Sequence, residues 1–496
     1  MTTKKAAKKS TKKAAKKVAK KAVKKAAKKS AKKAASKRSS GKGKLRVRMY
    51  RVGFGDFFLL TVPTKAGPKH ILIDCGVHAG NIGTMDDCVK DLVKETNGKL
   101  ALVIATHYHA DHLSGFASNF DDFAKFEVEQ VWITNRLDPE NEGASKFKAQ
   151  IRSLAGQLQL RLGLRAAGEE PDSDEALATT QAMFKVTDAL GIQLGAAKKE
   201  GDNEKALRLL TEGFKNKPKP KYYQGGDKPE LPKSLKGVIT AELLGPAPFD
   251  SGKDFAASDN KKEQYLAAAA DAGLPDERLR PFEKDWPSSS GEYPPGAFNE
   301  YRSPQEMEDL LNASQPDVLL AMADAVDGTL NNQSLVILFT VNKRKLLFVG
   351  DAQWGNWAYW LYGKKVTGED PGIIETAKDI LGSVDFFKVG HHGSTNANPI
   401  PAVAALNTKC VSMCSTESGD ETRGGKRPYG NLKKGTEVPR TVLMTELEKQ
   451  TGNRLVRSDW IPVLDVKASP EAKGQLKKLP PNFVQGELYV DYIFPN

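Results

Sequence analysis

The stretch LVIATHYHADHLSG, residues 102–115, contains three of the seven histidines of the 496-residue chain. Its first half is a short apolar run, which predicts a strand that is covered on both faces. His107, His109 and Asp111 then alternate along the chain, and alternate residues of an extended segment point to one side. His112 follows where the sequence can begin a helix. Imidazole and carboxylate groups clustered in this way predict a site for zinc or a similar divalent metal ion.

Candidate ligands also follow three other predicted strands. The run ILID ends at Asp74, KLLFVGD ends at Asp351, and His391 and His392 come directly after VDFFKVG. The two histidine motifs together hold five of the seven histidines. Because ligands of open α/β sheets bind beyond the carboxyl ends of the strands, we expect these four ends to meet at one edge. The sequence therefore predicts a metal-binding cleft at this edge.

The order of these motifs, H-x-H-x-D-H followed by G-D and then H, resembles that of the metallo-β-lactamase-fold hydrolases. The flanking segments VGFGDFFLL, LIDCG, NNQSLVILF, LLFVGD and KVGHHGS resemble the branch that includes the hydrolase domain of ComEC/Rec2-type competence proteins and the phosphorylcholine esterase domain. The resemblance covers about 45–135 and 318–396. It implies an α/β fold, a four-layer αβ/βα sandwich with a two-metal cleft, over residues 45–496. Helical and loop inserts are expected at about 140–235 and 249–317.

The resemblance also implies a role for each residue of the motifs. The expected metal ligands are His107, His109, Asp111, His112, Asp351 and His391. The first two would bind one ion, Asp111 and His112 the other, and Asp351 would bridge both. Asp111 and His392 are the catalytic candidates, with His392 left for a substrate phosphate or for the support of a ligand. Asp74 would orient a ligand or its loop through hydrogen bonds.

One departure from the family pattern concerns the first metal ion, which many members hold with a third histidine. Residues 113–390 contain neither histidine nor cysteine. The nearest candidates to complete this site are Asp327, Asn331 and Asn332. An oxygen-rich site tolerates manganese as well as zinc, so we expect two divalent ions, zinc first and manganese as the alternative.

The N-terminal segment differs in composition from the rest of the chain. Residues 1–44 contain nineteen lysines and Arg38 but no acidic residue, so the remaining residues carry 55 basic and 61 acidic side chains, a net charge of −6. A segment of this composition cannot bury enough apolar surface to fold alone, which predicts a disordered tail. It resembles the lysine/alanine-rich tails of histone-like proteins. We expect it to bind nucleic acid through lysines such as Lys4, Lys5, Lys8, Lys9, Lys12 and Lys13. A solvated tail that only aids solubility is the alternative.

The cysteine content and hydropathy of the chain indicate its compartment. Four cysteines in so long a chain predict no disulfide framework and therefore a reducing environment. The chain contains no run of eighteen apolar residues, so we expect no membrane span. The N-terminal segment lacks the apolar stretch of a secretory signal. We expect a cytoplasmic protein, associated with the nucleoid if the tail binds DNA. The oligomeric state is left open.

Three functions fit these features. The first is a metal-dependent phosphodiesterase or nuclease that uses metal-activated water and is tethered to nucleic acid by its tail. The second is a hydrolase of small phosphoesters or esters whose tail serves for localisation. The third is a non-catalytic protein associated with nucleic acid, against which the nearly complete ligand set argues.

Overall fold

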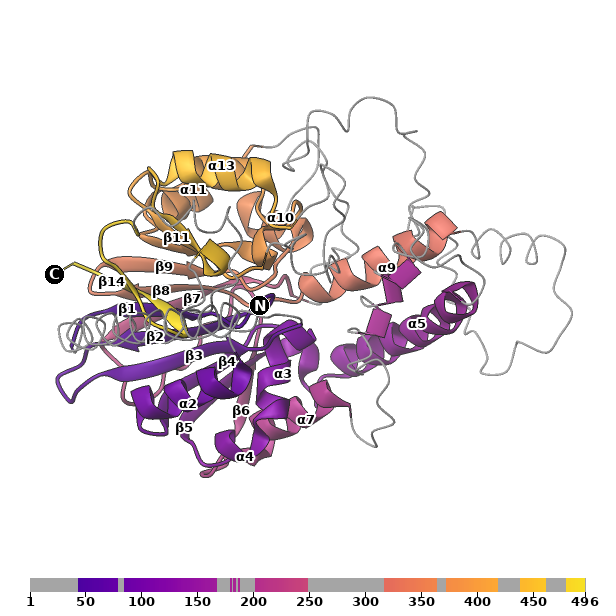
Figure 1. Ribbon diagram of the computed structural model, residues 1–496, viewed down its shortest axis with the longest axis horizontal. Coiled ribbons are helices and arrows are strands. Elements are labelled where there is room, and N and C mark those ends of the chain that lie inside the picture. Colours follow the sequence, from indigo (N-terminus) through magenta and orange to yellow (C-terminus); the bar gives the residue numbers. More distant parts are fainter. Residues whose placement is uncertain are drawn as a thin grey trace, which may run out of the picture.

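The structure is a computed structural model that describes most of the chain after the basic tail. The described ranges are 43–78, 84–166, 201–248, 316–363, 372–417, 438–460 and 479–495, with residues 179, 180, 182, 183, 186 and 187. Nearly all of the predicted tail and most of the predicted insert 249–317 lie outside these ranges. The described part is a mixed α/β structure built on two β-sheets, which confirms the predicted fold class (Figure 1).

The first sheet has eight strands in the order β13-β14-β1-β2-β3-β4-β5-β6. Their bounds are β1 (Arg46–Tyr50), β2 (Phe57–Val62), β3 (Lys69–Cys75), β4 (Lys99–Ala105), β5 (Glu127–Thr134), β6 (Pro220–Tyr223), β13 (Phe483–Gln485) and β14 (Tyr489–Ile493). Neighbours from β13 to β3 are antiparallel, and those from β3 to β6 are parallel. The strand β6 lies within the predicted insert 140–235, so the end of this range belongs to the body of the fold.

The second sheet has six strands in the order β12-β11-β10-β9-β8-β7. Their bounds are β7 (Ile239–Gly245), β8 (Val336–Val341), β9 (Arg344–Phe348), β10 (Phe386–Lys388), β11 (Val411–Cys414) and β12 (Leu455–Arg457). The strands from β9 to β12 are parallel, whereas β7, β8 and β9 form an antiparallel meander.

The two sheets share one apolar core, in which Ile104 and Trp132 of the first sheet pack with Phe339 and Phe348 of the second. Helices cover the outer face of each sheet (Figure 1). On the first sheet lie α2 (Met85–Thr96), α3 (Ala110–Ser118), α4 (Phe120–Phe123) and α7 (Asp202–Arg208), and on the second lie α10 (Trp354–Leu361), α11 (Glu375–Gly382), α12 (Ile400–Ala405) and α13 (Thr441–Gln450). Strands such as β4 are therefore covered on both sides, which explains their continuous apolar sequences.

A pair of long helices projects from this body beside the rim of the sheets (Figure 1). The helix α5 (Glu142–Ala166) packs against α9 (Pro316–Asn331) through a small apolar cluster that includes Leu158, Leu162 and Val326. The helix α5 lies in the predicted insert 140–235, whereas α9 begins at the end of the predicted insert 249–317 and lies almost entirely after it. Together they form one helical arm. The shorter elements are η1 (Asn135–Leu137), η2 (Leu209–Gly213), η6 (Gly390–Gly393) and η8 (Ser458–Trp460).

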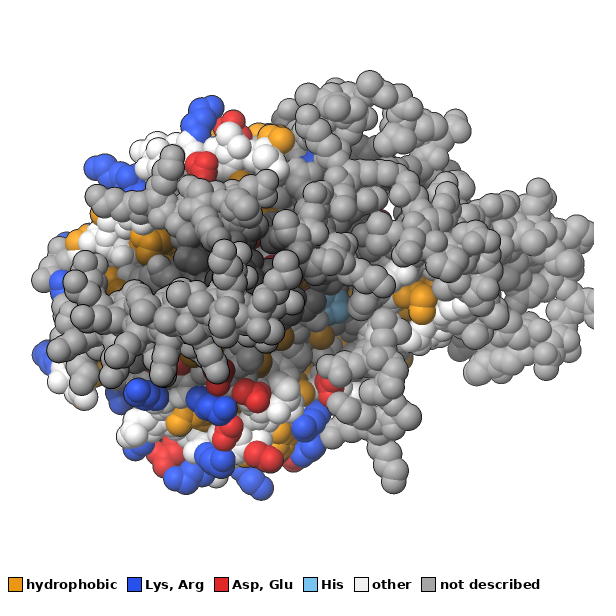
Figure 2. Space-filling model, in the orientation of Figure 1, with side chains coloured by type: hydrophobic (Ala, Val, Ile, Leu, Met, Phe, Trp, Pro, Cys, Tyr) orange, Lys and Arg blue, Asp and Glu red, His pale blue; other side chains and the backbone are white. Residues whose placement is uncertain are grey.

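The described surface carries both signs of charge. Figure 2 shows Lys and Arg side chains interspersed with Asp and Glu over the helices of the first sheet. Several of them are paired: Lys125 Nζ lies 2.9 Å from Asp122 Oδ1, and Lys215 Nζ lies 2.6 Å from Glu127 Oε1. Within the described ranges, no helix has both the length and the apolar character that crossing a membrane requires.

Candidate metal centre

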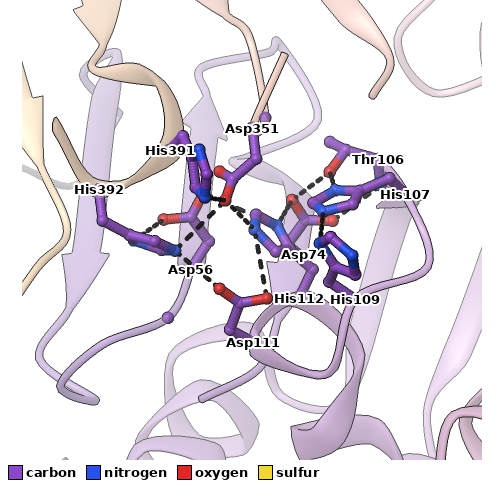
Figure 3. A network of polar contacts seen from close by, with 12 residues as sticks. Asp56, Asp74, Thr106, His107, His109, Asp111, His112, Asp351, His391 and His392 are labelled. Atoms are coloured by element: carbon purple, nitrogen blue, oxygen red, sulfur yellow. Dashed lines mark hydrogen bonds and ion pairs between the residues drawn. The ribbon is translucent and has the colours of Figure 1, made fainter. Parts of the chain in front are cut away.

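The predicted ligands meet where strands of both sheets end (Figure 3). His107 and His109 follow β4, and Asp111 and His112 occupy the first turn of α3. Asp351 follows β9, and the His391–His392 pair lies in η6 after β10. Asp111 and His392 are in contact although 281 residues separate them. The two halves of the sequence therefore contribute to one cluster.

Four of these side chains, Asp111, His112, Asp351 and His392, form a compact buried group (Figure 3). Each is at most 6% exposed. His392 Nε2 lies 2.9 Å from Asp111 Oδ2, and Asp351 Oδ2 lies 3.1 Å from His112 Nε2 and 3.4 Å from His392 Nε2. Three atoms of these side chains have no partner among the described residues at both the distance and the angle of a hydrogen bond: Asp111 Oδ1, His112 Nε2 and Asp351 Oδ2. Buried polar atoms that face one another without such partners fit a divalent cation. We call these residues the four-residue group.

Hydrogen bonds hold the two histidines of the four-residue group in one orientation. His112 Nδ1 lies 2.7 Å from Asp74 Oδ2, and His392 Nδ1 lies 2.8 Å from the carbonyl oxygen of Ser415. Each Nδ1–H therefore donates outward, and each Nε2 faces the group. Asp74 also accepts hydrogen bonds from the backbone N–H and the hydroxyl of Thr106, at 2.8 and 2.7 Å. This support by a carboxylate and a carbonyl is typical of metal-binding histidines.

A second group consists of His107 and His109, the histidines that we expected to bind the first metal ion, together with Asp111. His107 Nε2 lies 3.1 Å from His109 Nδ1, and both side chains are buried. Asp111 is common to both groups, whereas we expected Asp351 to be the shared ligand. Among the described residues, the nearest further carboxylate is that of Asp327 in α9, whose Oδ1 lies 3.9 Å from His109 Nε2.

The asparagines at the end of α9 have different roles. Asn331 Nδ2 donates to Asp327 Oδ2 at 3.0 Å, while its buried Oδ1 has no hydrogen-bond partner among the described residues. Asn332 instead binds the backbone: its Oδ1 accepts from Asn356 N at 3.0 Å, and its carbonyl oxygen accepts from Asn356 Nδ2 at 3.0 Å. Of the two asparagines, only Asn331 is therefore placed to support a metal ion near His109.

The two neighbouring histidines, of which we expected His391 to be the ligand, lie in different surroundings. His391 Nε2 lies 3.9 Å from Asp351 Oδ2, and its side chain is 16% exposed, whereas that of His392 is fully buried in the four-residue group. His391 Nδ1 lies 3.4 Å from Gln353 Nε2. This contact orients the His391 ring so that Nε2 faces Asp351. The geometry therefore places His392 within the four-residue group and His391 at its border.

Three residues of the site have left-handed backbone conformations that side chains other than glycine rarely adopt. The φ angles are 55° at Asp74, 46° at His391 and 52° at His392. Such conformations cost of order 1–3 kcal/mol each and persist where the surrounding structure fixes them, often at functional sites.

Burial and mutual contact give these groups unusual pKa values. Burial, together with the neighbouring His112 and His109, holds the pKa of His107 well below its usual range, so His107 is neutral, as a metal ligand must be. Burial alone would lower the pKa of His112, but Asp351 and other carboxylates raise it well above its usual value. Burial alone would raise the pKa of Asp111, but His112 holds it well below its usual range. A divalent ion would replace the charge compensation that protonated His112 provides.

Our sequence interpretation misses two buried charged residues, Asp56 and Lys388. Lys388 Nζ forms an ion pair with Asp56 and lies 3.2 Å from Asp351 Oδ1. Burial alone would lower the pKa of Lys388, but Asp56 and Asp351 raise it above its usual value. A sequence signal for Asp56 exists in GFGD: a Cβ on Gly55 would lie 2.4 Å from the carbonyl oxygen of Gly76, so only glycine allows this close approach. The signal for Lys388 is a lysine that ends an otherwise apolar strand.

Comparison with known proteins gives no family assignment, because no family model and no curated protein sequence matches the chain.

Proposed function

We propose that this protein is a metal-dependent hydrolase of the metallo-β-lactamase fold, and that its substrates are phosphodiesters. The observation that carries the proposal is the buried four-residue group, whose nitrogen and oxygen atoms face one another without aligned partners. Two sheets that share one core, with helices on both outer faces, support the four-layer αβ/βα arrangement that the sequence resemblance implies. The motif order H-x-H-x-D-H, G-D, H supports the same family.

The side chains divide between two metal positions. The four-residue group would hold one ion, and His107, His109 and the shared Asp111 would hold a second, with Asp327 as a further ligand. When bound, divalent ions bring the pKa of water toward neutrality and neutralise the oxygens of a scissile phosphate. Asp74 keeps His112 in the orientation that this requires. His391, partly exposed at the border of the cluster, is placed to contact a substrate oxygen.

Phosphodiesters fit this site and this chain better than neutral esters. Their anionic oxygens match divalent cations, and a tail with twenty basic residues attracts polyanions. We therefore propose that the tail brings the enzyme to DNA or RNA in the cytoplasm or nucleoid, and that the metal centre performs the hydrolysis.

A recess beside the second group favours a different candidate, a hydrolase of small phosphoesters. It opens to solvent. Its lining combines apolar and polar side chains: Tyr108, Arg136, Leu137, Phe147, Lys148, Ile151, Leu330 and Gln333. Two of these side chains, Arg136 and Lys148, are cationic, which suits an anionic ester.

An assay on metal-free protein tests the proposal. Zinc or manganese is added back, and hydrolysis of bis(4-nitrophenyl) phosphate, single- and double-stranded DNA, and RNA is followed. We expect metal-dependent hydrolysis of the chromogenic diester and of at least one nucleic acid, and none by the D111N variant. Hydrolysis of the chromogenic diester alone would favour the small-molecule candidate. Absence of hydrolysis from a protein shown to contain metal would contradict the proposal.

A further inference from the structure

Lys388 is a buried cation at the boundary between the two sheets. It is the last residue of β10, whose side chains alternate: Phe386 packs in the core between the sheets and Phe387 in the core beneath the outer helices. Because the side-chain period of a strand is two, Lys388 points back between the sheets. Its residue exposure is 2%, so the ammonium group must be compensated locally.

Three oxygens provide this compensation. Lys388 Nζ donates to the carbonyl oxygen of Gly350 at 2.7 Å, contacts Asp351 Oδ1 at 3.2 Å, and forms an ion pair with Asp56 Oδ2. Asp56 precedes β2 of the first sheet, and its backbone N–H donates to the carbonyl oxygen of Asp111 at 2.9 Å. A continuous series of contacts therefore links Asp111 with Asp351 through protein atoms alone.

We propose that Lys388 is a positioning residue that holds Asp351 as a one-oxygen metal ligand, and that Asp56 fixes Lys388 against the first sheet. The ammonium group occupies Oδ1, while Oδ2 faces His112 and His392 and has no aligned hydrogen-bond partner among the described residues. This inference rests on the metal centre of the proposed function but not on its substrate.

A double variant separates positioning from charge. K388M alone would leave the Asp56 carboxylate buried without its cation, which destabilises a fold strongly. K388M/D56N removes one positive and one negative charge, so the net charge near the metal site is unchanged. K388L/D56N makes the same charge change with a shorter side chain, so the comparison does not depend on a single variant folding. Each of these variants also carries H107A. This substitution removes a histidine of the second group, so that only the ion of the four-residue group is measured.

The measurement is calorimetric titration of the metal-free full-length proteins with zinc. We expect both double variants to bind the remaining ion about 10- to 100-fold more weakly than H107A alone, the usual effect of removing a group that orients a ligand. The control is R344M/D385N, which removes an ion pair with a 3.0 Å contact at the other end of β9 and β10 and should leave the affinity unchanged.

The outcomes distinguish the two proposals. If H107A binds zinc with the same affinity with and without K388M/D56N or K388L/D56N, Lys388 has no positioning role, and the metal centre is unaffected. An equal loss in R344M/D385N would show a general effect of weakening the second sheet, and would overturn the positioning role as well. Failure of H107A and of the unmodified protein to bind any ion would contradict the metal centre itself.

Discussion

At the scale of single residues, sequence neighbours can have opposite roles. His391 and His392 are adjacent, yet only His392 is fully buried among carboxylates with its Nδ1 bound to a backbone carbonyl. A repeated histidine in the sequence does not show which ring turns inward, because that depends on the left-handed backbone at both positions.

We expect H392A to reduce the metal content from about two ions per chain to about one, because it removes an imidazole ligand of the four-residue group. H391A should retain both ions and lower the rate of hydrolysis by weakening contact with the substrate. Elemental analysis of the two purified variants makes the comparison. Loss of an ion from H391A but not from H392A would reverse the assignment.

His70 provides a prediction about pH at a distance from the metal groups. It lies in β3, its Nδ1 is 3.2 Å from the Thr61 hydroxyl, and burial lowers its pKa to about 4 despite the nearby Glu95. The unfolded chain protonates histidine near pH 6.5, so the stability that neutral His70 confers is complete above that value and is lost as the pH falls toward 4.

The matching experiment is urea unfolding of the unmodified protein and of H70Q across this pH range. The stability of the unmodified protein should fall by about 2 kcal/mol more than that of H70Q between about pH 7 and about pH 5. Parallel curves for the two proteins would show that His70 does not titrate differently on unfolding.

At the scale of elements, α9 connects the helical arm to the metal centre. Its apolar side chains from Leu319 to Leu330 pack in one cluster with those of α5, and Asp327 lies near its C-terminal end beside His109. The sequence predicts helical structure in the insert that contains α5, but it does not predict α9 or the contact between the two helices, because this contact depends on how segments far apart in the sequence meet. The candidates to complete the second group, Asp327, Asn331 and Asn332, could be named from their position just before SLVILF, whereas the choice of Asp327 needed the structure.

Replacing Asp327 should weaken only the ion held by His107 and His109. We expect D327N to raise the zinc or manganese concentration needed for half-maximal activity by about tenfold, with little change in the maximal rate. D324N, at an exposed position about one turn earlier on α9, is the control and should behave like the unmodified protein. Equal metal requirements in all three proteins would show that this ion does not depend on the arm.

At the scale of the whole molecule, the sequence predicts the α/β class, the strand ends that carry the candidate ligands, and the charge difference between tail and body. It does not predict that β6 extends the first sheet, because PKYY is short and polar and becomes a strand only by pairing with β5. Nor does it predict the Lys388–Asp56 pair, because an ion pair between sheets depends on how two separately encoded sheets face each other.

Removal of residues 1–44 should abolish most of the affinity for nucleic acid and most of its dependence on salt. Lysines that neutralise phosphates release counterions, and the remaining chain has a net charge of −6. Turnover of a small diester should be unchanged. Filter binding at several salt concentrations measures the effect. The control is a full-length variant that keeps the charge of the tail, with arginine in place of Lys4, Lys5, Lys8, Lys9, Lys12 and Lys13. If the truncated chain still bound DNA tightly, the tail would have a role only in solubility.

The pairing of β1 with β14 has a consequence for how the protein is made. Arg48 in β1 is buried against Asp491 in β14, 443 residues later in the chain. At about 5–20 residues per second, a ribosome needs on the order of half a minute to cover that distance. Throughout this time the nascent β1 lacks its edge partner, and an open edge can pair with strands of other chains. The first sheet is therefore completed only after β14 has been synthesised, and until then this edge of β1 is open to strands of other chains.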